Sequence, residues 1–168
     1  MRRSGVLLPV TSLPSRFGIG TFSKEAYAFV DFLKEAGQKL WQILPLGPTG
    51  YGDSPYQSFS TFAGNPYFIS LAELVEEGVL IENGWLTEEE CENTDWGGSK
   101  SYVDYEKMYQ GRFPLLRKAY HNSHIAENAE FIAFCEENDW WLSDYALFMA
   151  IKDSQGGASF LEWDAPLK

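Results

Sequence analysis

Cysteine and histidine are scarce in this sequence, and their scarcity excludes a class of chemistry. Its 168 residues contain two histidines and two cysteines, Cys91 and Cys135, which lie in unrelated local contexts without a Cys-x-x-Cys spacing. These numbers argue against a structural zinc, a disulfide framework and metal chemistry in general. We therefore expect no metal site, and we predict two unpaired thiols in a reducing cytoplasm.

Positive charge and long apolar runs are also lacking. Lysine and arginine number 13 against 24 aspartates and glutamates, which gives a net charge of −11. Such a surface repels nucleic acid and anionic membranes, so neither is an expected partner, whereas a neutral ligand meets no such penalty. No apolar run approaches the ~18 residues of a membrane span, and Gly5–Val10 is too short for a signal peptide.

Aromatic residues, in contrast, are abundant, with six Trp, nine Tyr and twelve Phe. The chain is long enough to bury one sizeable core. Because aromatic side chains bury large areas and also stack on flat ligand faces, their number fits a large core, a ligand groove, or both.

The N-terminal segment has the pattern of a strand, a helix and a second strand. Short apolar runs at Gly5–Val10 and Leu40–Leu44 are typical of buried strands. Ser23 as N-cap and Gly37 as C-terminal stop bracket a helix between them. This unit predicts two parallel strands joined by a right-handed crossover.

Helical patterns dominate the rest of the chain. Thr87 and Glu90 have the spacing of a capping box, Asp104 is an expected N-cap, and Pro114 is expected to kink or restart the helix that Asp104 begins. The predicted helices cover Leu71–Glu77, Thr87–Glu92, Asp104–Gln110, Ala126–Glu137 and Trp140–Lys152.

The last of these helices is apolar nearly all round. Trp140–Lys152 is therefore expected to be deeply buried, and Asp144 within it should need a hydrogen-bond partner.

The predicted sheet is incomplete, because two parallel strands do not make a stable sheet alone. The chain therefore begins an α/β pattern without completing it and is predicted to be part of something larger. We divide it into 1–69, the βαβ unit with a long loop, and 70–168, a mostly helical subdomain.

The loop from Pro45 to Pro66 is long, irregular and rich in glycine and proline. A loop of this length is usually functional or disordered, and its aromatic residues favour an ordered, functional one. Its one carboxylate, Asp53, is expected to cap the turn at residues 52–55. Glycoside cleavage needs two carboxyl groups across the bond, and no second one is evident, so no catalytic residue is assigned.

A binding site for a neutral sugar needs flat apolar faces for stacking and short polar groups for hydrogen bonds. Tyr51, Ser54, Tyr56 and Gln57 supply that set on one loop. Phe59 and Phe62 are expected to plug the loop onto the core. For the tyrosines, ligand stacking and core packing are both open from the residues alone.

Several motifs are distributed along the chain, and the central one runs for some twenty residues. They are Ser12–Ser15, Gly18–Gly20, Leu40–Ser60 (LWQILPLGPTGYGDSPYQSFS), Ala63–Pro66, Val103–Tyr105 with Tyr109, Trp140–Leu142 and Asp144–Ala150. Together these motifs resemble the amylomaltase family of 4-α-glucanotransferases, also called disproportionating enzymes, and the resemblance spans essentially the whole chain.

The resemblance implies an α/β fold, the start of a (β/α)₈ TIM barrel, with the first two strands followed by a helical inserted subdomain. It further implies retaining transfer of linear α-1,4-glucans through a covalent glucosyl-enzyme, with no cofactor or metal. The family's catalytic carboxylates come later in sequence, so this chain is expected to be inactive alone.

By matching positions, Ser54 and Tyr56 resemble residues on the donor side of the cleft, with Gln57 beside them. Tyr51 and Tyr109 resemble a pair that forms a second glucan-holding surface. The implied partners are malto-oligosaccharides or other α-1,4-glucans. A non-catalytic α-glucan-binding module remains the alternative, because every assigned residue binds rather than reacts.

Overall fold

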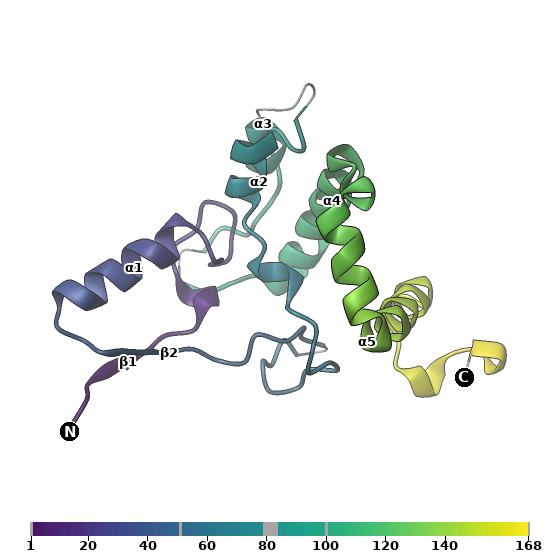
Figure 1. Ribbon diagram of the computed structural model, residues 1–168, viewed down its shortest axis with the longest axis horizontal. Helices are drawn as coiled ribbons and strands as arrows, with labels where there is room; N and C mark the ends of the chain where they lie inside the picture. Colours follow the sequence, from purple (N-terminus) through teal and green to yellow (C-terminus); the bar gives the residue numbers. More distant parts are fainter. Residues whose placement is uncertain (1, 51, 79–83, 100, 168) are drawn as a thin grey trace. The chain divides into compact units, whose positions relative to one another are not determined.

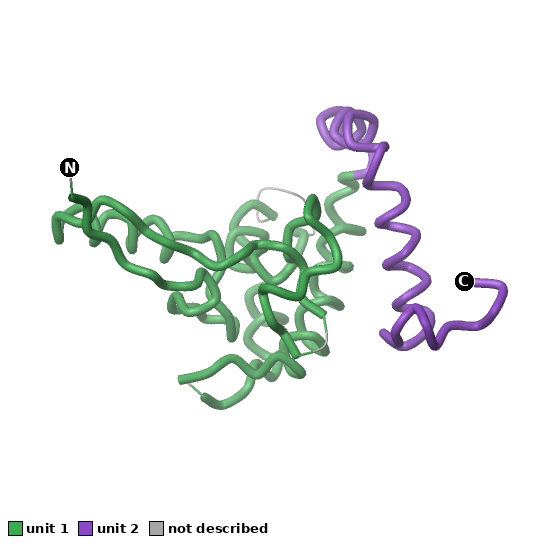
Figure 2. The backbone as a smooth tube through the Cα atoms, turned by 90° about the horizontal axis from the view of Figure 1, so that it is seen from below, with its two compact units in different colours: residues 1–125 green, residues 126–168 purple. Residues whose placement is uncertain are grey.

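The protein is described by a computed structural model that covers residues 2–50, 52–78, 84–99 and 101–167. The chain forms two compact units, Met1–Ile125 and Ala126–Lys168, which Figure 2 distinguishes by colour. Among the helices of the described residues, none has the length and apolar character that crossing a membrane requires.

The first unit begins with the predicted βαβ arrangement (Figure 1). Strand β1 (Gly5–Leu7) pairs in parallel with β2 (Leu40–Gln42), with Gly5 opposite Leu40 and Leu7 opposite Gln42. Both strands are shorter than predicted. The chain turns into a 3₁₀ segment, η1 (Val10–Ser12), because Leu13 and Ser12 donate backbone hydrogen bonds back to Val10 and Pro9.

Helix α1 (Lys24–Glu35) connects the two strands and packs on one side of them. Phe29 of α1 meets Trp41 of β2 edge-on, with ring centroids 5.0 Å apart. Ser23 occupies the N-cap position, but its hydroxyl donates to the Glu25 carboxylate instead of capping the backbone. Gly37 follows the helix with φ 73°, a left-handed conformation that favours glycine and ends the helix as predicted.

The prediction that both strands are buried is wrong for the described structure. All three residues of β1 are exposed, and Leu7 retains 56% of its accessible surface. The reason is that the contact of α1 falls on Trp41, the one partly buried residue of β2, and leaves the residues of β1 uncovered.

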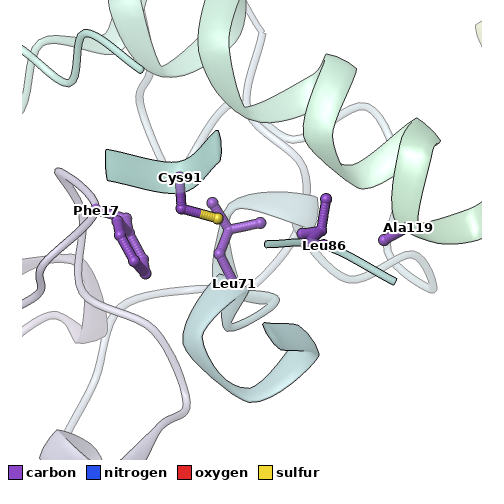
Figure 3. Close-up of a cluster of buried hydrophobic side chains, with 5 residues drawn as sticks. All are labelled: Phe17, Leu71, Leu86, Cys91 and Ala119. Atoms are coloured by element: carbon purple, nitrogen blue, oxygen red, sulfur yellow. The ribbon is translucent and has the colours of Figure 1, made fainter. Parts of the chain in front are cut away.

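A core of buried hydrophobic side chains lies where three helices meet (Figure 3). Leu71 of α2 (Leu71–Gly78), Cys91 of α3 (Glu88–Glu92) and Ala119 of α4 (Tyr105–Ser123) converge there, with Phe17 and Leu86 from the connecting segments. Cys91 is completely buried and is a free thiol, as is the partly buried Cys135 of the second unit, so both thiols are unpaired as predicted.

Local hydrogen bonds cap the N-termini of α3 and α4, as the sequence predicts. The Thr87 hydroxyl accepts from Glu90 N at 3.2 Å, and the Glu90 carboxylate accepts from Thr87 N at 3.0 Å, which completes the capping box. Asp104 accepts from Lys107 N at 3.2 Å and caps α4.

The restart of α4 at Pro114 is not observed, because one helix runs from Tyr105 to Ser123. A proline removes a single backbone donor from the helix interior. Buried Met108 and Arg112 lie before it and buried Ala119 lies after it, so core packing holds the helix on both sides of the proline.

The second unit contains one long helix, α5 (Ala129–Ser154), in place of the two predicted. Asn128 caps it by accepting from Glu130 N at 2.8 Å. No residue of α5 is buried, Trp140 is 68% exposed and Asp144 is exposed, so the predicted burial of this helix and of Asp144 is wrong. A helix that is apolar all round needs neighbours on every side. Besides α5, the described residues of this unit form only short 3₁₀ segments, η3 (Ile125–Glu127) before the helix and η4 (Phe160–Glu162) and η5 (Ala165–Leu167) after it. The first unit also contains the 3₁₀ segment η2 (Pro66–Phe68).

Candidate functional site

A cavity of about 110 Å³ opens in the first unit where the segments after β1 and β2 come together. Both segments leave the carboxyl ends of their parallel strands, the edge at which α/β proteins place ligands. The long loop, η2 and the first residue of α4 complete the wall. The lining residues are Pro9–Thr11, Leu44–Leu46, Thr49, Asp53, Pro55, Asn65, Tyr67, Phe68 and Tyr105.

Asp53 lines this cavity from a left-handed backbone conformation, with φ 52°. Its amide donates to the Gly50 carbonyl at 3.1 Å. The turn itself is capped by Ser54, whose hydroxyl accepts from Tyr56 N at 3.4 Å. The prediction that Asp53 caps the turn is therefore wrong: Ser54 stands two residues before that amide and reaches it, while Asp53 borders the cavity.

Three described residues of the cavity lining have raised pKa values, one aspartate and two tyrosines. Burial raises the pKa of the Asp53 carboxyl. Burial, with a smaller contribution from the Asp53 charge, raises the pKa of Tyr67 to about 12. Burial and then Asp53 also raise the pKa of Tyr105, against a hydrogen bond with the Thr11 side chain that lowers it. Both phenols therefore stay neutral and can donate hydrogen bonds at neutral pH.

No lysine or arginine is found among the described residues that line this cavity, and Asp53 is their only carboxylate. One acceptor, phenol and threonine hydroxyls and an apolar wall suit a neutral ligand that carries hydroxyl groups. Acid–base cleavage of a glycosidic bond needs two carboxyl groups, so the described lining can bind and orient such a ligand but does not hold both reacting groups.

The predicted donor-side residues lie together on the turn beside the cavity. Ser54 is partly buried, and Gln57 N donates to the Ser54 carbonyl at 3.1 Å. Tyr56 is 73% exposed and its ring is available for stacking. Their neighbours Asp53 and Pro55 line the cavity, whereas these three residues stand next to it. Tyr51 lies outside the described residues.

A series of ring contacts connects Tyr109 to the cavity wall, which Tyr109 itself does not line. It lies exposed on α4, and its ring centroid is 5.1 Å from that of Phe113. Phe113 is in turn 5.7 Å from Tyr67, which lines the cavity. The structure thus places Tyr109 two rings away from the cavity wall.

Phe59 and Phe62 keep 37% and 57% of their accessible surface, so neither is buried in the core, in contrast to the prediction. Serine hydroxyls contribute to the order of the loop. Ser58 Oγ donates to the Ser60 carbonyl at 2.7 Å, and Ser60 Oγ accepts from Ala63 N at 3.0 Å. A loop ordered by its own polar groups leaves its phenylalanines at the surface.

Sequence reasoning did not assign Thr11, Asn65, Tyr67 and Tyr105 to the site. Asn65 fixes the shape of the cavity wall. Its backbone N–H donates to the Leu46 carbonyl at 2.9 Å, and its side-chain Oδ1 accepts from Tyr67 N at 3.0 Å. Asn65 directly before Pro66 is the one local signal for this cap.

Gly20 accounts for part of the Gly18–Gly20 motif. Its amide donates to the Thr11 carbonyl at 3.1 Å, which holds η1 against the returning chain. A Cβ at Gly20 would lie 2.8 Å from both the backbone N and O of Leu13, so no larger residue fits without a shift. The glycine keeps Thr11 at the cavity wall.

The sequence profile of the 4-alpha-glucanotransferases, glycoside hydrolase family 77, matches residues 8–168. The chain belongs to this family. It is 47% identical to the 4-alpha-glucanotransferase of Thermus thermophilus over 99% of its own length, and 46% identical to that of Clostridium butyricum over 95%. It spans about a third of the length of these family 77 relatives, 32% and 31% respectively.

A solved structure agrees with this assignment. The amylomaltase from Streptococcus agalactiae in complex with acarbose superposes with a TM-score of 0.86 at 46% identity, over 98% of this chain and 32% of that protein. The fold of the chain is therefore that of the corresponding part of a family 77 enzyme.

Proposed function

We propose that this chain is the N-terminal third of a 4-α-glucanotransferase that acts on linear α-1,4-glucans by retaining transfer through a covalent glucosyl-enzyme. The match of residues 8–168 to the family carries the proposal. A cavity lined by hydroxyls, one carboxylate and apolar walls, without a cation among its described residues, supports a neutral glucan as ligand. The relative's complex with acarbose supports a carbohydrate ligand as well.

Within that enzyme, we propose that Ser54, Tyr56 and Gln57 bind the donor glucan, and that Tyr51 and Tyr109 form a second glucan-holding surface. The catalytic carboxylates then belong to the part of the relatives' length that this chain does not span. The chain's contribution is to hold and orient the glucan.

The same proposal covers the architecture and location. Residues 1–69 would form the first βαβ unit of a TIM barrel with its substrate loop, and residues 70–168 the first inserted subdomain. The parallel pairing of β1 and β2 supports such a start. The free thiols of Cys91 and Cys135 fit a reducing cytoplasm.

Substituting Tyr56 tests the proposed donor site. We expect Tyr56→Ala, made in the protein at its natural length, to lower the rate of maltotriose disproportionation about fivefold, because an aromatic stacking face is worth about 1 kcal/mol. Tyr27→Ala is the matched control, since both tyrosines are 73% exposed and Tyr27 lies on α1. Equal rates for the two variants would remove Tyr56 from the site.

The alternative, a non-catalytic glucan-binding module, is favoured by one observation, the single carboxylate in the described cavity lining. The gene sequence beyond Lys168 separates the two functions. Continued strand–helix alternation with aspartate and glutamate at later strand ends supports the transferase, and a stop codon supports the module. Glucan transfer by residues 1–168 alone would contradict our assignment of the catalytic groups.

A further inference from the structure

We propose that Asp53 is a specificity-determining residue whose carboxylate accepts hydrogen bonds from two adjacent hydroxyls of one glucosyl unit in the cavity. This inference rests on the proposed function and adds a residue to it. Asp53 occupies the wall between Thr49 and Pro55, one residue before the predicted donor-side residues.

The first support is the state of the carboxylate. Among the described residues, no donor forms a hydrogen bond with the Asp53 side chain, which is partly exposed. A carboxylate that lines a cavity and has no protein donor is available to accept hydrogen bonds from a ligand there.

The second support is the backbone. Asp53 is one of two described non-glycine residues with a positive φ, the other being His124. Aspartate tolerates the left-handed conformation better than most residues, but glycine would occupy it without strain. A contact between the carboxylate and a ligand would explain why aspartate, and not glycine, occupies this position.

The third support is the size and chemistry of the space in front of it. The cavity of about 110 Å³ is several times what one water needs. Val10, Leu46 and Phe68 offer apolar surface, and the neutral phenols of Tyr67 and Tyr105 add donors. A pyranose edge matches this wall, because its adjacent hydroxyls donate to a carboxylate while its C–H groups face the apolar side chains.

Two substitutions separate this role from a role in loop shape. Asp53→Asn keeps the size and the tolerance for positive φ but removes the charge, and Asp53→Gly keeps the backbone conformation but removes the side chain. In the protein at its natural length, we expect both to lower kcat/KM for maltotriose by about tenfold to a hundredfold, the range for losing a hydrogen bond to a charged group. Asp31→Asn, on the exposed side of α1, is the matched control and should equal the wild type.

The decisive measurement uses monodeoxy maltotrioses, each lacking one hydroxyl. We expect the wild type to lose kcat/KM with the analogues that lack either recognised hydroxyl, whereas Asp53→Gly loses nothing further with those same analogues. A uniform loss across all substrates would overturn the inference, because a residue that only shapes the loop affects them equally. So would unchanged kcat/KM in both variants.

The wild type distinguishes this inference from the proposed function. If it transfers no glucan from maltotriose, the proposed function fails. If it transfers glucan and the Asp53 variants behave like Asp31→Asn, the function stands and the inference fails.

Discussion

Tyr67 shows how one residue couples the core to the candidate site. Only 6% of its surface is exposed, its ring packs on Tyr105 and Phe113, and it also lines the cavity. Burial, followed by the nearby Asp53 charge, raises the pKa of its hydroxyl to about 12. The hydroxyl is therefore an uncharged donor across the whole physiological pH range.

This pKa predicts a loss of stability in alkali. A tyrosine in the unfolded chain ionises near pH 10, while Tyr67 in the folded chain holds its proton to about pH 12. Between these values the folded state binds more protons, so the free energy of unfolding falls as pH rises, with the contribution intact below about 10. Arg112, whose pKa burial lowers to about 10, contributes with the opposite sign over this range. The effect of Tyr67 is therefore measured as the difference between the wild type and Tyr67→Phe in urea unfolding from pH 9 to 12.

Tyr67→Phe is the comparison variant, because it lacks the ionisable hydroxyl and keeps the ring. We expect its unfolding free energy to fall less steeply over the same range. A fall of the same steepness in both proteins would mean that other groups cause the alkaline loss.

At the scale of elements, the buried Arg112 joins α4 to two segments distant in sequence. Its side chain donates to the Phe17 carbonyl at 3.5 Å and to the Ile69 carbonyl. Burial lowers the pKa of the guanidinium to about 10, so it stays charged at neutral pH. Ile69 follows η2, whose residues line the cavity, so this contact ties the cavity wall to α4.

Removing this link should be costly. We expect Arg112→Ala to lower the free energy of unfolding by about 3 kcal/mol, since it leaves a cavity and two carbonyls without their donor. Denaturant titration measures the change. Lys34→Ala, an exposed cation on α1, should stay within about 0.5 kcal/mol of the wild type. An equally small change in Arg112→Ala would show that the buried charge costs as much as its contacts return.

At the scale of the whole molecule, large apolar side chains remain exposed in each unit considered by itself. Val6, Leu7 and Leu40 are exposed on β1 and β2, and Trp140 and Leu147 on α5. Exposed apolar patches and unpaired strand edges promote association.

We therefore expect the 168-residue chain alone to bind an apolar fluorescent dye and to self-associate at micromolar concentration. Dye titration and light scattering after size exclusion measure the two effects. The protein at its natural length is the control, and we expect it to show less of both. A monomeric, dye-silent 168-residue chain would contradict the expectation.

Features that depend on residues close in sequence could be predicted from the sequence alone. The capping box of Thr87 and Glu90 and the cap at Asp104 were predictable because donor and acceptor stand three residues apart. The parallel βαβ unit followed from apolar runs around one helix, and the family followed from continuous motifs such as Leu40–Ser60.

Which residues share the cavity depends on the fold and could not be predicted from the sequence. Thr11, Asp53, Tyr67 and Tyr105 come from four separate segments, and no local pattern brings them together. The sequence predicts a turn cap at Asp53 because it does not reveal the residue's left-handed backbone or its neighbours. The prediction that α5 is buried was wrong for a related reason. An apolar sequence shows that a helix can be covered by other elements, and the packing of the surrounding chain determines whether it is.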